Sequence, residues 1–245
     1  MVVAIDIGNT QTHIGFYRNG KFEKILNLPT EKSGKEKVLK KIFLGNNFVA
    51  IAIASVVPQV TEGYIKFFKK FLHTMPLIVS GKLKTPVKFR YRNINNLGAD
   101  RIANVVGANL RYKKDLIIFS FGTATVCDVV LKNGKYLGGL IAPGIKTGIR
   151  ALESRTTLLK KVPLKIPKKF LGLSTEECLQ SGILNGTRLM VQGVIREIEG
   201  QYRKKFFCVS TGGLGKLMKD LIPEISLYDP ELTLYGIIKI YYLNV

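Results

Sequence analysis

The chain repeats its own opening pattern 114 residues later. Its start predicts an apolar strand, a small-residue turn and a second strand, and the same order returns near the middle. Gly122 lies 114 residues after Gly8, and Asn133 lies 114 residues after Asn19, each asparagine being followed by glycine. An Asn-Gly pair between two apolar runs predicts a two-residue hairpin turn. The chain is therefore expected to fold as two related halves.

Each half has the same order of predicted elements: three strands, a helix, a strand, a helix and a strand. In the first half, strands are expected at 2–6, 12–17, 22–28, 48–54 and 77–79, with helices at 35–45, 59–72 and 98–111. In the second half, strands are expected at 115–121, 125–131, 135–141, 206–210 and 225–228. Helices are expected after Gly144, at 174–203 with a break near 182–186, from the glycines at 212–213 to 221, and at 231–242. Interleaved helices and strands predict an α/β fold with two mixed sheets, and we place the domains at 1–112 and 113–245.

The net charge of +21 raises the question of an anionic partner. A basic protein can bind nucleic acid, an anionic membrane or an acidic ligand. Residues 1–110 carry 17 basic and 6 acidic side chains, and residues 111–245 carry 21 and 11, so the charge is evenly spread. The densest cluster, 160–169, contains two prolines and no aromatic residue. This pattern favours a solvated lysine-rich surface over a nucleic-acid site.

Three further features indicate a cytoplasmic protein that does not bind a membrane. The longest apolar run, 48–57, has ten residues and is too short to cross a bilayer. Asp6 interrupts the apolar residues near the start, where a signal peptide would need a basic segment and an apolar core. The three cysteines are an odd number without metal-ligand spacing, which indicates free thiols in a reducing compartment.

Three glycine-containing turns have residue types that suit phosphate binding. In the first, Asp6 ends a strand before Gly8, and a carboxylate there suits a hydrated magnesium ion that bridges phosphate oxygens. Glycine permits close backbone approach, while the Asn and Thr that follow offer donors to an anion. The second turn is Gly122-Thr123-Ala124-Thr125. The third is Thr211-Gly212-Gly213-Leu214-Gly215, whose glycines would let an adenine or ribose lie against the backbone, with the N-terminus of the following helix near phosphate.

Each of these turns also matches an ordinary tight turn of the chain. Their repetition favours function, because two such turns facing each other across a cleft would hold a nucleotide's phosphates from both sides. An ATP-using enzyme is therefore the first hypothesis.

The run Gly98-Ala99-Asp100-Arg101 opens a predicted helix. Asp100 at this position can be a helix cap and nothing more. It can equally be the general base of a kinase, which accepts the proton of an attacking hydroxyl. Arg101 would then steady an anionic substrate or the transferring phosphoryl group. The sequence leaves both interpretations open.

Taken in order, these motifs resemble those of the type III pantothenate kinases over the whole chain. The resemblance is carried by five blocks: 6–10, 98–101, 122–125, 138–145 and 174–182. It implies two ribonuclease-H-like domains of the acetate and sugar kinase, heat-shock chaperone and actin superfamily, in agreement with the internal repeat. It also implies a homodimer that uses ATP and magnesium to phosphorylate pantothenate, the first step toward coenzyme A.

The resemblance implies roles for individual residues. Asp100 would be the general base, and Asp6 would lie near magnesium. Arg101 suits the substrate carboxylate because it is always charged and binds in a bidentate manner. The residues expected to hold pantothenate are Tyr91, Gly98, Ala99, Asp100 and Arg101, with Thr175 reaching the substrate of the partner subunit. Those expected to bind ATP are Asp6, Ile7, Gly8, Asn9, Thr10, Gln11, Thr12, His13, Gly122, Thr123, Thr125, Gly212 and Gly213.

One departure from the family pattern stands out. The family usually begins its second phosphate motif with Asp, where potassium or ammonium binds, but this chain has Ser120. A hydroxyl is a far weaker cation ligand than a carboxylate, so the resemblance does not carry over potassium dependence. Asp128, eight residues on, either compensates or occupies an outward or buried strand position. Two rival functions stay open: another small-molecule kinase of the same superfamily, and a non-enzymatic regulator on this scaffold.

Overall fold

A computed structural model describes residues 1–45, 48, 50–155 and 162–245. The chain forms two compact units. The first contains Met1–Lys113, Val130–Gly138 and Glu231–Val245, and the second contains Lys114–Val129 and Gly139–Pro230. Two segments from the later part of the sequence therefore pack with the first unit. The division at 112 and 113 follows the sequence repeat, whereas these units follow the packing.

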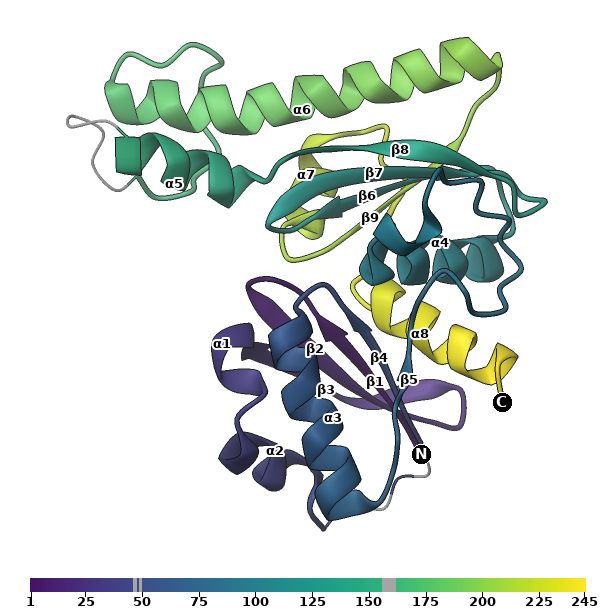
Figure 1. Ribbon diagram of the computed structural model, residues 1–245. Helices are drawn as coiled ribbons and strands as arrows, with labels where there is room; N and C mark the ends of the chain where they lie inside the picture. The colour runs from purple at the N-terminus through teal and green to yellow at the C-terminus, as the bar shows by residue number, and fades with distance from the viewer. Residues whose placement is uncertain (46–47, 49, 156–161) are drawn as a thin grey trace. The chain divides into compact units, whose positions relative to one another are not determined.

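The first unit contains a five-stranded sheet with the order β3-β2-β1-β4-β5 (Figure 1). Its strands are β1 (Val2–Ile7), β2 (Gln11–Arg18), β3 (Lys21–Pro29), β4 (Ala50–Ser55) and β5 (Leu77–Ile78). Antiparallel pairing joins β1 to β2 and β2 to β3, and parallel pairing joins β1 to β4 and β4 to β5. The central strand β1 reads as a nearly continuous apolar run because both of its faces are covered.

Helices cover both faces of this sheet. They are α1 (Thr30–Ser33), α2 (Glu36–Phe43), α3 (Pro58–Leu72), α4 (Ala99–Tyr112) and α8 (Leu232–Leu243), with a short 3₁₀ helix at Ile94–Asn96. Val3 and Ile5 of β1 join Phe43 of α2 and Phe68 of α3 in one buried cluster. Ala4 is also fully buried and, because side chains alternate along a strand, it points to the opposite face. There α8 packs against β1, β4 and α4.

The second unit repeats the topology of the first. Its sheet has the order β8-β7-β6-β9-β10 when read from the edge that corresponds to β3. This is the order of the first sheet with each strand replaced by its counterpart in the repeat. The elements are β6 (Leu116–Phe121), β7 (Ala124–Val130), β8 (Tyr136–Pro143), α5 (Ile145–Arg155), α6 (Thr175–Tyr202), β9 (Phe207–Thr211), α7 (Gly215–Leu221) and β10 (Leu227–Tyr228). Parallel pairing joins β6 to β9 and β9 to β10. The predicted duplication of a mixed α/β sheet is confirmed.

The expected break in the long helix α6 is wrong: the helix is continuous over 28 residues. Glycine in a helix interior costs only about 1 kcal/mol, and burial of Leu184, Val191 and Ile195 along α6 offsets that cost. The N-terminus is also capped, since Ser174 Oγ accepts from the Glu177 N–H at 3.3 Å. Of the helices within the described ranges, none combines the length and the apolar character that a bilayer crossing needs.

Two glycines allow α4 and α8 to cross at close range in the first unit. A Cβ atom at Gly107 would lie 2.9 Å from the carbonyl oxygen of Leu232 and 3.0 Å from the Cα of Gly236. A Cβ atom at Gly236 would overlap the carbonyl of Ala103. The two helix backbones are therefore in direct contact, and neither position has space for a side chain.

We expect Gly236→Ala to lower the free energy of unfolding by about 1–3 kcal/mol or more, because an added methyl group must push α8 away from α4. Gly200→Ala in α6 is the matched control, since a Cβ there meets nothing within 4 Å. Alanine at 200 should leave stability unchanged or raise it by up to about 1 kcal/mol. Urea unfolding of both variants measures the difference, and equal stabilities would show that the crossing accommodates a side chain.

Candidate active site

The first glycine turn joins β1 to β2 in the first unit. Asp6 is paired with His13 across these strands, and the His13 Nδ1 lies 3.5 Å from the Asp6 Oδ2. The Gly8 N–H donates to the Gln11 carbonyl at 3.1 Å, which closes the turn. The side chains at 9–11 are exposed. The structure thus brings together, within one turn, the carboxylate, the imidazole and the exposed polar residues that the sequence predicted.

A buried layer of hydroxyl groups lies directly behind this turn. Thr30 donates from Oγ1 to the Gly8 carbonyl at 2.7 Å and from its backbone N–H to the Thr10 carbonyl at 3.1 Å. The Thr12 Oγ1 lies 3.1 Å from the Thr30 Oγ1 and 3.0 Å from the Ser33 Oγ. Sequence reasoning missed Thr30 and Ser33, because a Pro-Thr pair after a strand matches no phosphate motif.

Not every residue from 6 to 13 presents its side chain at the turn. Ile7 and Thr12 are both fully buried, Ile7 in the apolar core and Thr12 in the hydroxyl layer. Their side chains point inward because alternate residues of a strand face opposite sides. These two side chains therefore support the turn from inside, and a contact of Ile7 or Thr12 with a nucleotide would use the backbone.

The second glycine turn joins β6 to β7 in the second unit and is one residue shorter than the first. The Gly122 N–H donates to the Ala124 carbonyl at 3.0 Å, two residues on, whereas the bond in the first turn spans three. The Thr123 carbonyl accepts from the Gly144 N–H at 3.1 Å and from the Thr147 Oγ1 at 2.6 Å. The start of α5 is therefore fixed to this turn, while Gly122 and Thr123 stay exposed.

Thr125 occupies the position in β7 that Thr12 occupies in β2. It is fully buried, and within the described part of the chain its Oγ1 has no hydrogen-bond partner. Its side chain thus faces the interior of the second unit. A contact of Thr125 with ATP would therefore use its backbone, as for Thr12.

The third glycine turn packs against the end of β6 in the same unit as the second turn. Gly212 has a φ of +84°, and a Cβ there would lie 2.8 Å from the Phe121 carbonyl oxygen. The Leu214 N–H donates to that carbonyl at 3.1 Å, and the Gly215 N–H donates to the Gly212 carbonyl at 2.9 Å. Gly212 therefore has a conformation and a close approach that only glycine satisfies easily. The second and third predicted turns are neighbours.

The Gly98–Arg101 run forms the cap and first turn of α4. The Arg101 N–H donates to the Asp100 Oδ1 at 2.8 Å, and a Cβ at Gly98 would lie 2.6 Å from the same oxygen. The Arg101 guanidinium is buried, and its Nη2 donates to the Tyr136 hydroxyl at 2.9 Å. Ala99 is buried beside them. A carboxylate at a helix N-terminus is electrostatically favoured there.

The other predicted positions are placed separately. Tyr91 is 38% exposed in the segment before Ile94–Asn96, and Thr175 is exposed at the first residue of α6. Ser120 is partly buried on β6 and is paired with Thr211 of β9. Asp128 is buried on β7, at 2% exposure, so its outward alternative is excluded.

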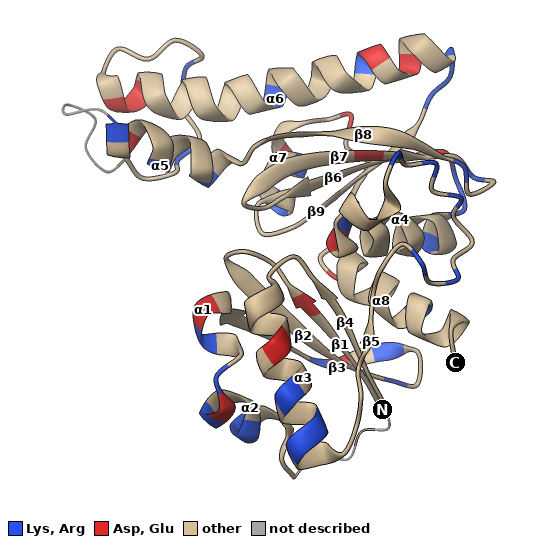
Figure 2. Ribbon diagram, viewed as in Figure 1, with Lys and Arg blue, Asp and Glu red and all other residues tan. Residues whose placement is uncertain are grey.

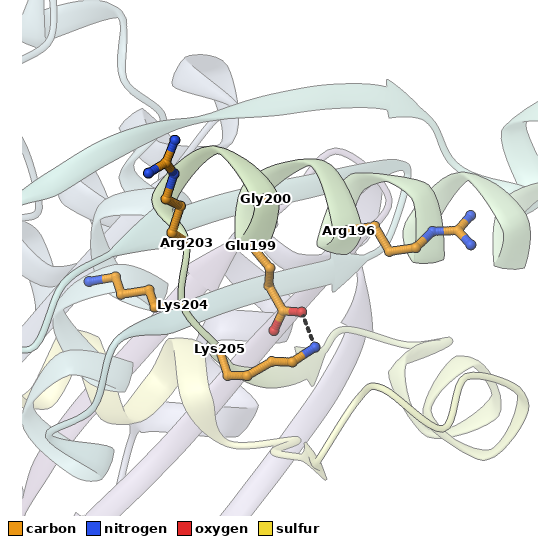
Figure 3. Close-up of a pocket in the computed structure, with 6 residues that line it drawn as sticks. All are labelled: Arg196, Glu199, Gly200, Arg203, Lys204 and Lys205. Atoms are coloured by element: carbon orange, nitrogen blue, oxygen red, sulfur yellow. Dashed lines mark hydrogen bonds and ion pairs between the residues drawn. The ribbon is translucent and has the colours of Figure 1, made fainter.

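The pocket in Figure 3 lies at the C-terminal end of α6 and contains no predicted site residue. Its volume is about 490 Å³, and it is lined by Arg196, Glu199, Gly200, Arg203, Lys204 and Lys205. Lys205 pairs with Glu199 at 2.6 Å, and Lys204 pairs with Asp115 at 2.7 Å. Arg196 and Arg203 point away from each other. The cations do not converge on one position, and Lys and Arg are distributed over several elements of each unit (Figure 2).

Two adjacent glycines provide a matched pair of substitutions in the third turn. Gly212→Ala is expected to lower stability by about 1–3 kcal/mol, because alanine is strained at positive φ and its Cβ meets the Phe121 carbonyl. Gly213→Ala should leave stability within about 0.5 kcal/mol, since a Cβ there meets nothing within 4 Å. Thermal unfolding distinguishes the two, and equal melting temperatures would contradict this account of Gly212.

Solved structures with low sequence identity show the fold. A protein named as a Baf family transcriptional activator, from Campylobacter jejuni, aligns with a TM-score of 0.65 and 20% identity, covering 98% of this chain and 97% of that one. A protein named as a 2-dehydro-3-deoxygalactonokinase, from Sinorhizobium meliloti, aligns with a TM-score of 0.60 and 10% identity, covering 98% and 96%. The fold is that of the actin-like ATPases and sugar kinases, with two ribonuclease-H-like domains, as the family resemblance implied.

Sequence comparison is more specific. The type III pantothenate kinase from Sulfurihydrogenibium sp. (strain YO3AOP1) is 37% identical over 246 residues, covering 97% of this chain and 98% of the relative. The family model described as type III pantothenate kinase matches residues 2–197, which include both repeated turns and the Gly98–Arg101 run. With the fold, the motifs and this identity in agreement, the chain belongs to the type III pantothenate kinase family.

Proposed function

We propose that this chain transfers a phosphoryl group from ATP to pantothenate with Asp100 as the general base. Its family membership accounts for the reaction, which forms 4′-phosphopantothenate in the first step of coenzyme A biosynthesis. The observation that carries the assignment of Asp100 is the position of its carboxylate, held in the first turn of α4 by the Arg101 N–H. A general base must be held in one orientation to meet the hydroxyl whose proton it accepts.

In this mechanism Asp100 accepts the proton as the pantothenate hydroxyl attacks the γ-phosphorus in line. A loose transition state needs little nucleophilic strength, so correct positioning provides most of the rate enhancement. Gly98 contributes by leaving space for the carboxylate, because a Cβ at this position would lie 2.6 Å from the Asp100 Oδ1. Gly98 and Arg101, one on each side of Asp100 in the motif, thus act on the same oxygen.

The phosphates of ATP are proposed to bind the exposed parts of the glycine turns. In the first unit, residues 9–11 offer backbone N–H groups and polar side chains beside Asp6 and His13. In the second unit, Gly122 and Thr123 are exposed at the start of β7, and Gly212 and Gly213 lie beside them. Backbone N–H groups stabilise the negative charge that spreads over the transferring phosphoryl group.

Asp6 fits magnesium that arrives with ATP. Among the described residues no group of three or more His, Cys, Asp or Glu side chains could hold a metal ion. Magnesium usually keeps several waters and is held by one or two carboxylates plus substrate phosphates, so a single carboxylate at the turn is sufficient. Asp6 would hold the ion through water, and the ion would neutralise charge on the phosphates.

Pantothenate is proposed to contact Tyr91 and the Gly98–Arg101 run. The Arg101 guanidinium donates to the Tyr136 hydroxyl at 2.9 Å, and this bond helps to orient the cation proposed to bind the substrate carboxylate. Thr175 is proposed to reach the substrate bound by the partner subunit of a homodimer. The exposed apolar side chains near α5 and α6 support such an interface: Leu152, Ile166, Phe170, Leu171, Leu173 and Leu189.

A cytoplasmic setting is proposed from the cysteines and the substrates. Cys127, Cys178 and Cys208 are all free thiols, with Cys178 exposed. Burial raises the pKa of the Cys208 thiol to about 12, so this group stays protonated and unreactive at physiological pH. Free cysteines are usual in reducing compartments, where ATP is also available.

We expect Asp100→Asn to lower kcat by about 10²–10⁴-fold, the range typical for loss of a general base. The KM for ATP should change little, because the nucleotide is proposed to bind the glycine turns. Asp220→Asn is the control, since that carboxylate is exposed on α7 and pairs only with Lys216 in the same helix among the described residues. Steady-state assays of phosphopantothenate formation test this, and near-normal turnover would remove Asp100 from the role.

We also expect phosphopantothenate formation from pantothenate and magnesium ATP to proceed without potassium. Ser120 and Thr211, its partner in register, supply hydroxyl groups where a carboxylate would bind the cation. Assays with potassium chloride or tetramethylammonium chloride at equal ionic strength test this, and Ser120→Asp should restore stimulation by potassium. Product only with potassium would contradict the expectation. No product in either buffer, from folded protein, would contradict pantothenate kinase activity itself.

A further inference from the structure

We propose that Thr30 is a positioning residue that aims the backbone N–H groups of the first glycine turn at the phosphates of ATP. The inference rests on the proposed role of that turn in ATP binding. Thr30 follows the third strand and lies outside the glycine turns and the Gly98–Arg101 run. It is 3% exposed, so it acts through the turn and has no direct contact with a nucleotide.

Thr30 holds the turn at two carbonyl groups. Its hydroxyl donates to the Gly8 oxygen at 2.7 Å, and its backbone N–H donates to the Thr10 oxygen at 3.1 Å. A third bond, from the Gly8 N–H to the Gln11 carbonyl, closes the turn from within. One residue thereby fixes the carbonyl ends of two of the peptide groups that form the turn.

The planarity of the peptide bond converts this anchoring into an orientation. In a trans peptide the C=O and the following N–H point in opposite directions, and the described residues contain no cis peptide. Drawing the Gly8 carbonyl inward to Thr30 therefore directs the Asn9 N–H outward, on the side where the Asn9 side chain is exposed. The bond from the Thr30 N–H to the Thr10 carbonyl holds the end of the turn in place, next to Gln11, whose carbonyl accepts from the Gly8 N–H across the hairpin. Outward N–H groups in a turn form the concave anion site that phosphates require.

Proton counting shows that the hydroxyl layer is built to keep Thr30 in this role. The Thr30 hydroxyl proton is used on Gly8, and the Ser33 hydroxyl donates to the Thr30 carbonyl at 3.0 Å. The Thr12 hydroxyl lies within hydrogen-bond distance of both the Thr30 and the Ser33 oxygens, and because each hydroxyl has only one proton, Thr12 donates to one of them at a time. Every hydroxyl proton in this layer thus has an acceptor. The acceptor of the Thr30 hydroxyl proton is the Gly8 carbonyl of the turn.

The helix that begins at Thr30 is itself fixed by close packing. A Cβ at Gly63 of α3 would lie 2.9 Å from the carbonyl oxygen of Gly34, which follows α1. A Cβ at Gly34 would in turn lie 3.2 Å from a methyl carbon of Val60. The backbone of α1 has no room to shift toward α3, so Thr30 provides a fixed reference for the turn.

The test compares three substitutions in the full-length enzyme. Thr30→Val keeps the shape and the backbone N–H but removes the hydroxyl, Thr30→Ser keeps the hydroxyl, and Thr30→Ala removes it without adding bulk. Thr61→Val is the matched control, because the Thr61 hydroxyl donates to Ser55 and Val57 in the same unit and does not contact the turn. The measurements are the Kd of a non-hydrolysable ATP analogue with magnesium, the KM for each substrate, kcat and the melting temperature.

Thr30→Val and Thr30→Ala are expected to raise the Kd of the ATP analogue and the KM for ATP about threefold to tenfold, the effect of one lost hydrogen bond. The KM for pantothenate should stay within about twofold, and Thr30→Ser should restore ATP binding. Thr61→Val should lower the melting temperature without changing ATP binding.

Normal ATP binding by either hydroxyl-free Thr30 variant would overturn the proposal and leave Thr30 a purely structural residue. An equal loss of ATP binding in Thr61→Val would also overturn it, because any destabilisation of the unit would then have the same effect. Failure of the folded wild-type protein to bind the ATP analogue is a separate outcome. It would overturn the role of the glycine turn in ATP binding, and this proposal with it.

Discussion

Each unit depends on a central strand that is covered on both faces. In β1, Val3, Ala4 and Ile5 are fully buried, and in β6 the same is true of Leu116 and Ile117. A strand enclosed in this way satisfies its polar groups through the sheet and has no room for polar side chains along its length. Polar chemistry becomes possible only where the strand ends. The first two glycine turns directly follow β1 and β6, so the fold itself determines where the candidate functional residues lie.

The two turns share an origin in the repeat but differ in how they are supported. The first is held at its Gly8 carbonyl by the Thr30 hydroxyl, which belongs to the short helix after β3. The second is held at its Thr123 carbonyl by Gly144 and Thr147, at the start of α5. In both cases a helix that follows the third strand of the repeat supplies the support. In each turn a carbonyl group accepts hydrogen bonds from the protein, which leaves backbone N–H groups of the turn available to bind an anion.

Glycine has a different function at each place where the structure requires it. At Gly107 and Gly236 it allows two helices to touch backbone to backbone, and at Gly212 it supplies a positive φ beside a carbonyl. At Gly98 it leaves space for the Asp100 carboxylate. In contrast, Gly182 in α6 has open space around it and no such constraint, and the helix continues through it. The glycine content of a sequence therefore does not distinguish these functions.

The sequence by itself determined the duplicated α/β topology, the position of each glycine turn and the helix that follows Gly98. These features depend on local periodicity, turn chemistry and capping, which act over a few residues. Only the tertiary structure decided that Thr12 and Thr125 face inward, that α6 is continuous, that the C-terminal helix packs with the first unit, and that Thr30 reaches the Gly8 carbonyl. Each of these features depends on contacts between residues distant in sequence, or on burial that offsets a local preference. Local sequence patterns do not specify which distant residues come into contact.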